Sequence, residues 1–148
     1  MNAVETVQSV LSAIEANDWE RARGYLADDF IFGGAMPEPI GPDAWLGVHR
    51  ALGSAMPDFS FNARGLHDEN GQVAGHLQIT GTQTRELALP VPGIPRIQPT
   101  GKRVSMPTEN ITVTVRGGKL AAFMVGEVAG GGLPGILAQL GVALPAHS

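Results

Sequence analysis

Apolar residues in the first third of the chain recur at the spacing of amphipathic helices. A stripe at every third or fourth position predicts a first helix, formed by Val4, Val7, Val10, Leu11 and Ile14. Residues 19–26 predict a second, short helix after a break at Asn17-Asp18. Gly41-Pro42-Asp43 predicts the start of a third helix that runs to about residue 55, because proline is tolerated in a first turn and an acid suits the positive end of the helix dipole.

The rest of the chain is patterned like strands. Apolar and polar residues alternate over 59–64 and 73–84, and two strand-like runs flank Gly117-Gly118 between residues 107 and 128. A short closing helix is expected at 133–140, after three glycines. Helices followed by strands predict one α+β domain spanning residues 1–148, with the helices on one face of a mostly antiparallel sheet.

The run from 107 to 128 carries the clearest indication of a functional group. Gly117-Gly118 can supply the positive φ angles of a two-residue type I′ turn, so the run predicts a β-hairpin. In the register that this turn sets, one face is apolar except for Glu109, which would point into the core. A buried carboxylate is unfavourable unless it is paired or protonated, and its pKa is usually raised. A one-residue bulge would exchange the faces and turn Glu127 inward instead.

A proline-rich loop precedes the hairpin. Residues 89–99 contain four prolines and cannot form a central strand, because proline has no amide hydrogen to donate. The loop is nevertheless partly apolar, with Val91, Ile94 and Ile97. Two interpretations stay open: a flap over the mouth of a cavity, or a cap on the core.

Composition excludes several classes of function. The chain has 148 residues, of which 43% are hydrophobic and 16% charged, and a net charge of -4, so it is globular and no nucleic-acid partner is expected. The absence of cysteine excludes disulfides and thiolate catalysis. No apolar run has membrane-spanning length and no signal peptide is found, so we expect no membrane partner and a cytoplasmic location. The four histidines lack ligand spacing, and no metal site is expected.

Several segments, in order, resemble the SnoaL-like polyketide cyclase family of the nuclear transport factor 2-like superfamily. They are LADDFIF (26–32), GPDAW (41–45), AMPDFSF (55–61), ITGTQT (79–84), PTGKRV (99–104), GGKLAAF (117–123) and GILAQLG (135–141). The resemblance implies a cone-shaped fold: three N-terminal helices packed on a curved, mostly antiparallel sheet, a short C-terminal helix and an internal pocket. It also implies cyclase, isomerase or hydrolase chemistry and a homodimer.

The family's catalytic residues carry over poorly. The position of the family's essential Asp falls on Val128, with Glu127 beside it. One family His position falls on Asn110, next to Glu109, and another falls on Gln83. The base of a cyclase would therefore have to come from elsewhere, and the resemblance supports a pocket more strongly than a reaction.

We expect a hydrophobic small-molecule ligand or substrate and no cofactor. Glu109 is the acid/base candidate, Asn110 or His49 would position the substrate or its developing oxyanion, and Glu127 is a second acid. The residues expected to shape the pocket are Phe32, Trp45, Phe59, Phe61, Leu77, Ile79, Met124 and Val128.

Alternatives remain for both the residue and the protein. Glu109 could instead be held in an ion pair at the pocket rim by Arg64, Arg85 or Lys102. The protein could be a non-catalytic ligand binder of the same fold, which the loss of the family Asp favours. A third interpretation is an assembly module that uses the open side of the sheet as a dimer interface.

Overall fold

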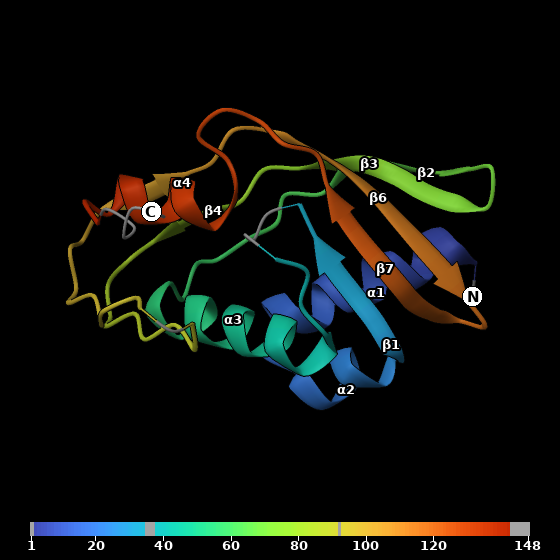
Figure 1. Ribbon diagram of the computed structural model, residues 1–148, viewed down its shortest axis with the longest axis horizontal. Coiled ribbons are helices and arrows are strands. Elements are labelled where there is room, and N and C mark those ends of the chain that lie inside the picture. Colours follow the sequence, from blue (N-terminus) through green and yellow to red (C-terminus); the bar gives the residue numbers. More distant parts are fainter. Residues whose placement is uncertain (1, 35–37, 92, 143–148) are drawn as a thin grey trace.

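The computed structural model describes residues 2–34, 38–91 and 93–142, and Figure 1 shows their arrangement. Within these residues no helix is long and apolar enough to cross a membrane. In chain order the elements are α1 (Ala3–Glu15), α2 (Trp19–Gly24), β1 (Leu26–Gly33), α3 (Pro42–Ala55), β2 (Arg64–Glu69), β3 (Gln72–Leu77), β4 (Thr80–Thr82), β5 (Arg103–Ser105), β6 (Glu109–Arg116), β7 (Lys119–Val125) and α4 (Gly132–Gln139).

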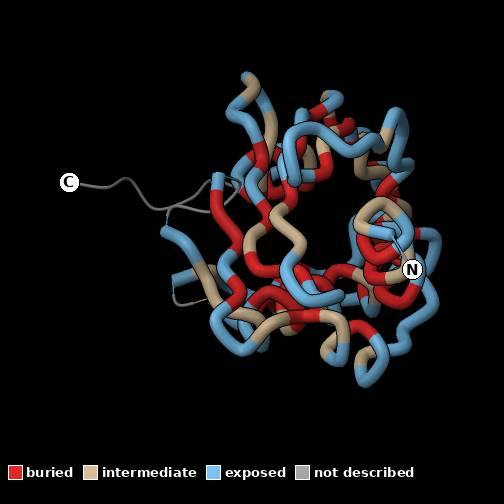
Figure 2. The backbone as a smooth tube through the Cα atoms, turned by 90° about the vertical axis from the view of Figure 1, so that its right-hand side faces the viewer, coloured by how far each residue is buried: buried red, intermediate tan, exposed pale blue. Residues whose placement is uncertain are grey.

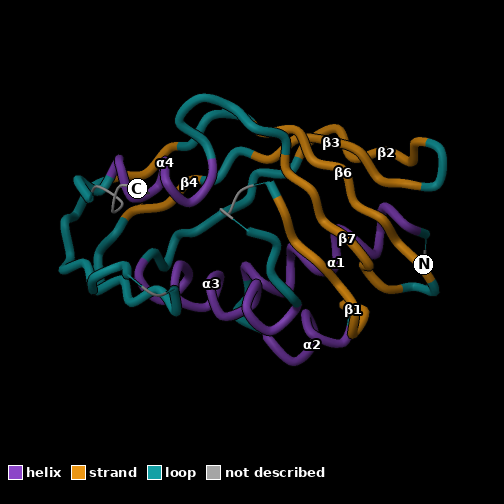
Figure 3. Tube along the Cα trace, in the orientation of Figure 1, coloured by secondary structure: helices purple, strands orange, loops and turns teal. Residues whose placement is uncertain are grey.

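The strands form a curved, mostly antiparallel sheet that the helices cover. Its order is β1-β7-β6-β3-β2, with β1 and β7 parallel and the other pairs antiparallel, while β4 and β5 pair separately. Helix α1 packs against β2, β3, β6 and β7, and α3 packs against β1 (Figure 3). Buried positions lie on the inner sides of these elements (Figure 2). The predicted α+β class, the three N-terminal helices and the short C-terminal helix are confirmed.

The first helix begins at a pair of capping residues, Asn2 and Glu5. The Asn2 side chain accepts a hydrogen bond from the Glu5 amide at 2.8 Å, and the Glu5 carboxylate accepts one from the Asn2 amide at 3.1 Å. This reciprocal pair is a capping box, which satisfies two amides that a helix start leaves free. The apolar stripe then lies against the sheet, and Val7 and Val10 are fully buried.

The 107–128 run is a hairpin, but only one of its strands keeps the predicted register. Gly117 and Gly118 have φ angles of 61° and 76°, as the type I′ turn requires. The partners shift between Thr114 and Val115, because Ala121 is an extra residue in β7. This bulge leaves the inward face of β6 unchanged and exchanges the two faces of β7.

Consequently the prediction for β7 is wrong beyond the bulge. Phe123 and Val125 are buried, whereas Met124, which was expected inside, has 42% of its surface exposed. Glu127 is nevertheless not turned inward: β7 ends at Val125, and Glu127, two residues further on, is exposed. Met124 and Ile31 are exposed on the outer face of neighbouring strands. The expected homodimer stays a prediction.

The segment between α3 and the hairpin differs from the prediction in two places. Residues 59–63 form no regular strand, and within them one isolated bridge joins Ser60 to Thr80. The predicted strand at 73–84 is two strands in different sheets, β3 and β4, with residues 78 and 79 between them. Alternation alone does not separate these cases, because an extended segment that packs on the core alternates just as a paired strand does.

The proline-rich loop caps the core. Leu87, Leu89 and Ile97 are buried, and Leu87 pairs with Ile97 in an isolated bridge. Gln83, which is fully buried, holds the base of the loop. Its side-chain amide contacts the carbonyl oxygens of Arg85, Ile97 and Gln98 at 3.1–3.2 Å, and its side-chain oxygen accepts from the amide and hydroxyl of Thr100 at 3.1 and 2.7 Å.

We expect Gln83→Leu to destabilise the protein by about 1–3 kcal/mol. Leucine has a similar volume but no polar group, so the buried carbonyl and amide groups that Gln83 binds would lose their partners. Urea unfolding gives the free energy, and limited proteolysis should locate new cleavage between residues 85 and 101. The matched control is Gln72→Leu, which removes an exposed side chain with one hydrogen bond, to Thr114. Equal stability of the two variants would contradict the role given to Gln83.

Candidate functional site

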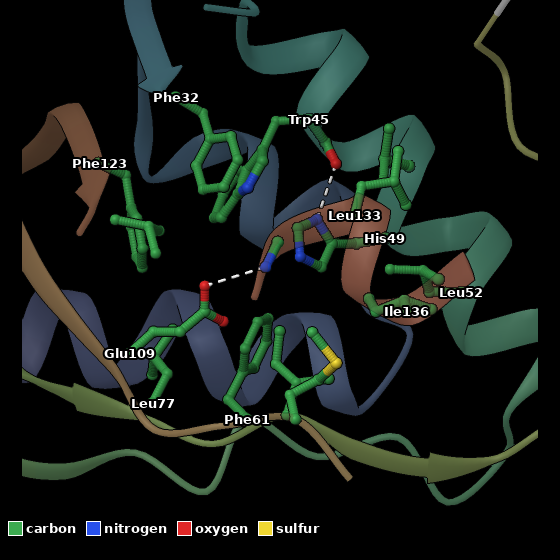
Figure 4. Close-up of a pocket in the computed structure, with 15 residues that line it drawn as sticks. Phe32, Trp45, His49, Leu52, Phe61, Leu77, Glu109, Phe123, Leu133 and Ile136 are labelled. Carbon is green, nitrogen blue, oxygen red and sulfur yellow. Dashed lines mark hydrogen bonds between the residues drawn. The ribbon is translucent and has the colours of Figure 1, made fainter. Parts of the chain in front are cut away.

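A small cavity lies between the inner face of the sheet, α3 and α4 (Figure 4). Its volume is about 50 Å³, which is enough for water or a compact chemical group. Three lining residues carry a polar side-chain group: Trp45, His49 and Glu109. The other lining residues are Phe32, Val48, Leu52, Phe61, Leu77, Ile79, Met106, Phe123, Val125, Gly132, Leu133 and Ile136.

Glu109 is the acidic group of the cavity. It opens β6 opposite Leu77 of β3, and the alternation of β6 turns its side chain inward, where only 4% of the residue is exposed. Its carboxylate accepts one hydrogen bond, from the Gly132 amide at 3.2 Å (Figure 4). Burial raises the pKa of Glu109, and the hydrogen bond from Gly132 opposes that rise.

The ion-pair alternative for Glu109 is not what the structure contains. Among the described residues, none of the ion pairs involves Glu109. Arg64, one of the three expected partners, instead donates to the side-chain oxygen of Gln78 at 3.2 Å. Glu109 is therefore a carboxyl group in apolar surroundings with no neighbouring cation to hold it ionised.

His49 faces the same cavity from α3. Its Nδ1 lies 2.9 Å from the backbone oxygen of Trp45, one helical turn earlier. Because that oxygen can only accept, Nδ1 carries the proton, and in the neutral ring Nε2 is an acceptor. The ring's other nitrogen, Nε2, lies on the side toward Glu109 (Figure 4). Burial lowers the pKa of His49 to about 4, with the hydrogen bond to Trp45 opposing this, so the ring is neutral at pH 7.

Trp45 forms an aromatic wall of the cavity. Its ring is packed against Phe30, Phe32, Phe123 and His49, with centroid distances of 5.0–5.6 Å. The residue is 1% exposed, and its Nε1 has no hydrogen-bond partner among the described residues. A buried donor without a partner costs about 1–3 kcal/mol, so this N–H is a polar group that the fold itself leaves unsatisfied.

The structure brings together some of the expected site residues and separates others. Besides Glu109 and His49, the cavity is lined by Phe32, Trp45, Phe61, Leu77 and Ile79. Phe59 is buried but stands behind the lining, edge-on to Phe61 at 5.0 Å. Met124 and Glu127 are exposed, and Val128 is half-buried outside the lining.

Asn110 lies on the outer face of the sheet. Its side-chain oxygen is 2.7 Å from Nδ1 of His76, and the residue is exposed. This follows from the alternation of β6, because the neighbour of an inward Glu109 must point outward. Asn110 therefore does not contact the cavity in which it was expected to position a substrate.

Sequence reasoning missed the roof of the cavity. Leu133 and Ile136 reach it from α4, and Phe123 and Val125 reach it from β7. The i, i+3 spacing of Leu133 and Ile136 could have indicated one buried face of the closing helix. No comparable signal marks Phe123 and Val125, because the bulge that turns them inward leaves no trace in the sequence. Within the described part of the chain, His, Asp and Glu gather in no group of three that could hold a metal ion.

Comparison with known proteins places this geometry in a family. The SnoaL-like domain matches residues 7–123. No curated protein matches the chain. AclR from Streptomyces galilaeus, provisionally assigned as a hydroxylase, is 18% identical with a TM-score of 0.69 over 93% of each chain. IdmH from Streptomyces antibioticus, provisionally assigned as a polyketide cyclase, is 24% identical with a TM-score of 0.66 over 93% of this chain and 97% of that one.

A third solved structure extends the range of chemistry on this fold. The LEH-like epoxide hydrolase of M. tuberculosis is 15% identical with a TM-score of 0.65, and the match covers 93% of this chain and 91% of that one. Identities this low establish a shared fold, and what each relative does is a statement about that relative.

We expect His49 to keep a neutral Nδ1–H ring down to a pH near 4, because protonation would place a charge in the apolar cavity. Long-range proton–nitrogen NMR spectra of the histidine rings across pH 3.5–8 would show both the tautomer and the titration. His67 is the internal control, because hydrogen bonds to Gly65 and Glu69 raise its pKa at an exposed site. Titration of His49 near 6.5 would contradict its placement.

We expect Glu109→Gln to raise the free energy of unfolding at pH 7 by about 0.5–2 kcal/mol. The amide oxygen can still accept from Gly132, but no buried charge forms. Because the folded pKa of Glu109 lies above its ordinary 4.5, the wild type loses stability as pH rises from 4.5 through the folded pKa. Urea unfolding should therefore show the two proteins converging below about pH 4.5. A constant difference across pH would contradict the raised pKa.

Proposed function

We propose that this chain, which belongs to the SnoaL-like domain family, is a cofactor-independent enzyme that moves a proton on a hydrophobic small molecule. The reaction would be of the cyclase, isomerase or hydrolase type. One observation carries the proposal: Glu109 is buried in a largely apolar cavity with no cationic partner among the described residues. A carboxyl group with a raised pKa in a cavity is a candidate acid or base, because its pKa has moved toward the pH at which enzymes work.

The proposed step is removal of a proton next to a carbonyl group. The ionised Glu109 takes the proton from the α-carbon and forms a new O–H bond. The C–H electron pair becomes the carbon–carbon double bond of an enolate, and the carbonyl π pair moves to the substrate oxygen. The largely apolar lining leaves the carboxylate poorly solvated, which makes it a stronger base. From this enolate either ring closure or isomerisation can follow.

Similar structures support an enzyme of this fold rather than one reaction or substrate. The solved relatives carry assignments as a hydroxylase, a polyketide cyclase and an epoxide hydrolase. The family's catalytic Asp has no counterpart in the cavity, since its position is Val128 here and Val128 lies outside the lining.

Access for a substrate larger than the cavity would require α4 to move. Leu133 and Ile136 of this helix line the cavity. The φ angle is positive at Gly130 in the preceding turn, at 76°, and at Gly132, the first residue of the helix, at 69°. Gly132 is also the residue whose amide binds Glu109. Displacement of α4 would therefore open the cavity and free the carboxylate in one movement.

The test is proton–deuterium exchange at the α-carbons of cyclopentanone in D2O, followed by NMR. We chose this compact ketone because the cavity is small. The wild type should accelerate exchange over buffer, and Glu109→Gln should reduce that acceleration by about 10²–10⁴-fold, the usual contribution of a positioned acid or base. Glu127→Gln is the matched control: it removes an exposed carboxylate just beyond β7, the strand that pairs with Glu109's, and should leave the rate unchanged.

Each other result points to a different conclusion. Loss of exchange in Glu127→Gln but not in Glu109→Gln would assign the base to Glu127. No acceleration by the wild type, together with binding of the ketone, would favour the alternative of a non-catalytic ligand binder. Unfolding curves of both variants are needed beside the rates, so that a loss of fold is not taken for a loss of the base.

A further inference from the structure

Of the buried polar side-chain atoms that the structure describes, Nε1 of Trp45 is the one without a hydrogen-bond partner. The indole lines the same cavity as Glu109, and the residue is 1% exposed. An indole N–H can only donate, so the missing partner must be an acceptor. A ligand bound in the cavity that this residue lines would supply one.

The ring is held rigidly in this position. Phe30 packs on it with a centroid distance of 5.1 Å. Phe32 and Phe123 pack on it at 5.6 and 5.4 Å, and His49 stands edge-on at 5.0 Å (Figure 4). Rotation of the indole toward another acceptor would break these contacts. A donor that is fixed before the ligand arrives needs no reorganisation during a reaction, which is the property that makes hydrogen-bond donors effective at a developing negative charge.

Neither of the other two polar residues can serve the same purpose. Nδ1 of His49 carries the proton and uses it on the backbone oxygen of Trp45, so the nitrogen nearest the cavity is an acceptor. The nearby Gly132 amide already donates to Glu109. Asn110, which the sequence suggested for this task, lies on the other face of the sheet. Trp45 is therefore the donor that remains for a ligand.

The lining also limits the charge of the ligand. Its described residues include one carboxyl group and neither lysine nor arginine. A phosphate or carboxylate there would meet Glu109 with no cation to offset the repulsion, so an anionic ligand is strongly disfavoured. A neutral molecule with one accepting oxygen and an otherwise apolar surface fits both the N–H of Trp45 and the apolar lining.

We propose that Trp45 donates its indole N–H to the carbonyl oxygen of a neutral ketone or aldehyde substrate, and stabilises the enolate oxygen that forms when Glu109 removes the α-proton. This inference rests on the proposed function and names its substrate class and its oxyanion donor. The two residues divide the reaction: Glu109 acts on the carbon, and Trp45 acts on the oxygen.

The first test follows the indole N–H signals of ¹⁵N-tryptophan-labelled protein. The chain has two tryptophans, and a Trp19→Phe variant assigns them. Cyclopentanone should move the Trp45 proton signal downfield in a saturable way, whereas methylenecyclopentane, in which a CH2 group replaces the oxygen, should not. The Trp19 signal should stay in place. A Trp45 signal that does not move with cyclopentanone, or that moves equally with both compounds, would overturn the proposal.

The same titration on Glu109→Gln separates this inference from the proposed function. The hydrogen bond from Trp45 does not need the base, so the shift should persist when exchange is lost. A shift in the wild type without Glu109-dependent exchange would mean that the carbonyl site stands and the proposed reaction fails. Exchange that depends on Glu109, with no shift of the Trp45 signal, would mean that the proposed reaction stands and the role of Trp45 fails.

The second test removes the N–H while keeping the shape of the ring. In the Trp19→Phe background, 3-benzothienylalanine in place of tryptophan puts sulfur where Trp45 has its N–H. The affinity for cyclopentanone should fall about 5- to 10-fold, as expected for loss of one hydrogen bond, while that for methylenecyclopentane stays the same. An equal loss for both compounds would show that Trp45 only packs, and would overturn the proposal.

Discussion

Strand β6 lies between β7 and β3, and the alternation of its side chains decides which groups face the helices. The same strand places Ile111 and Val113 in the core and Glu109 in the cavity. It also ties the cavity to the closing helix, because Glu109 accepts the amide hydrogen of Gly132, the residue at which α4 begins. The packing of the core and the position of the carboxyl group therefore have one cause, and a one-residue slip of β6 would remove both.

The two strands of the hairpin differ in how well the sequence predicts which side chains face inward. The inward position of Glu109 was predictable because its strand alternates clearly between apolar and polar residues and starts from a turn whose two glycines fix the register. The sequence LAAFMV of β7 is apolar on both faces, so either register buries apolar side chains and the pattern selects neither. For this reason nothing in the sequence marked the bulge at Ala121. The prediction placed Met124 inside, whereas the structure buries Phe123 and Val125 instead.

Buried polar contacts were the least predictable part of the site. Gln83 stands where the resemblance puts a family histidine, and its sequence neighbours give no sign that its amide holds a loop 14 to 17 residues further on. The free N–H of Trp45 depends on how four aromatic rings from β1, α3 and β7 pack together. Such features arise from three-dimensional proximity, which periodicity does not contain.

The apolar wall acts on both titratable groups of the cavity in the same way. Desolvation disfavours the charged form of either, so it raises the pKa of Glu109 and lowers that of His49. In the proposed reaction one negative charge passes from Glu109 to the substrate oxygen, and the total charge of the cavity does not change. The penalty for burying that charge is then common to both states. The barrier then reflects the difference in free energy between the charge on Glu109 and the charge on the substrate oxygen. In the proposal, Trp45 stabilises only the charge on the substrate oxygen.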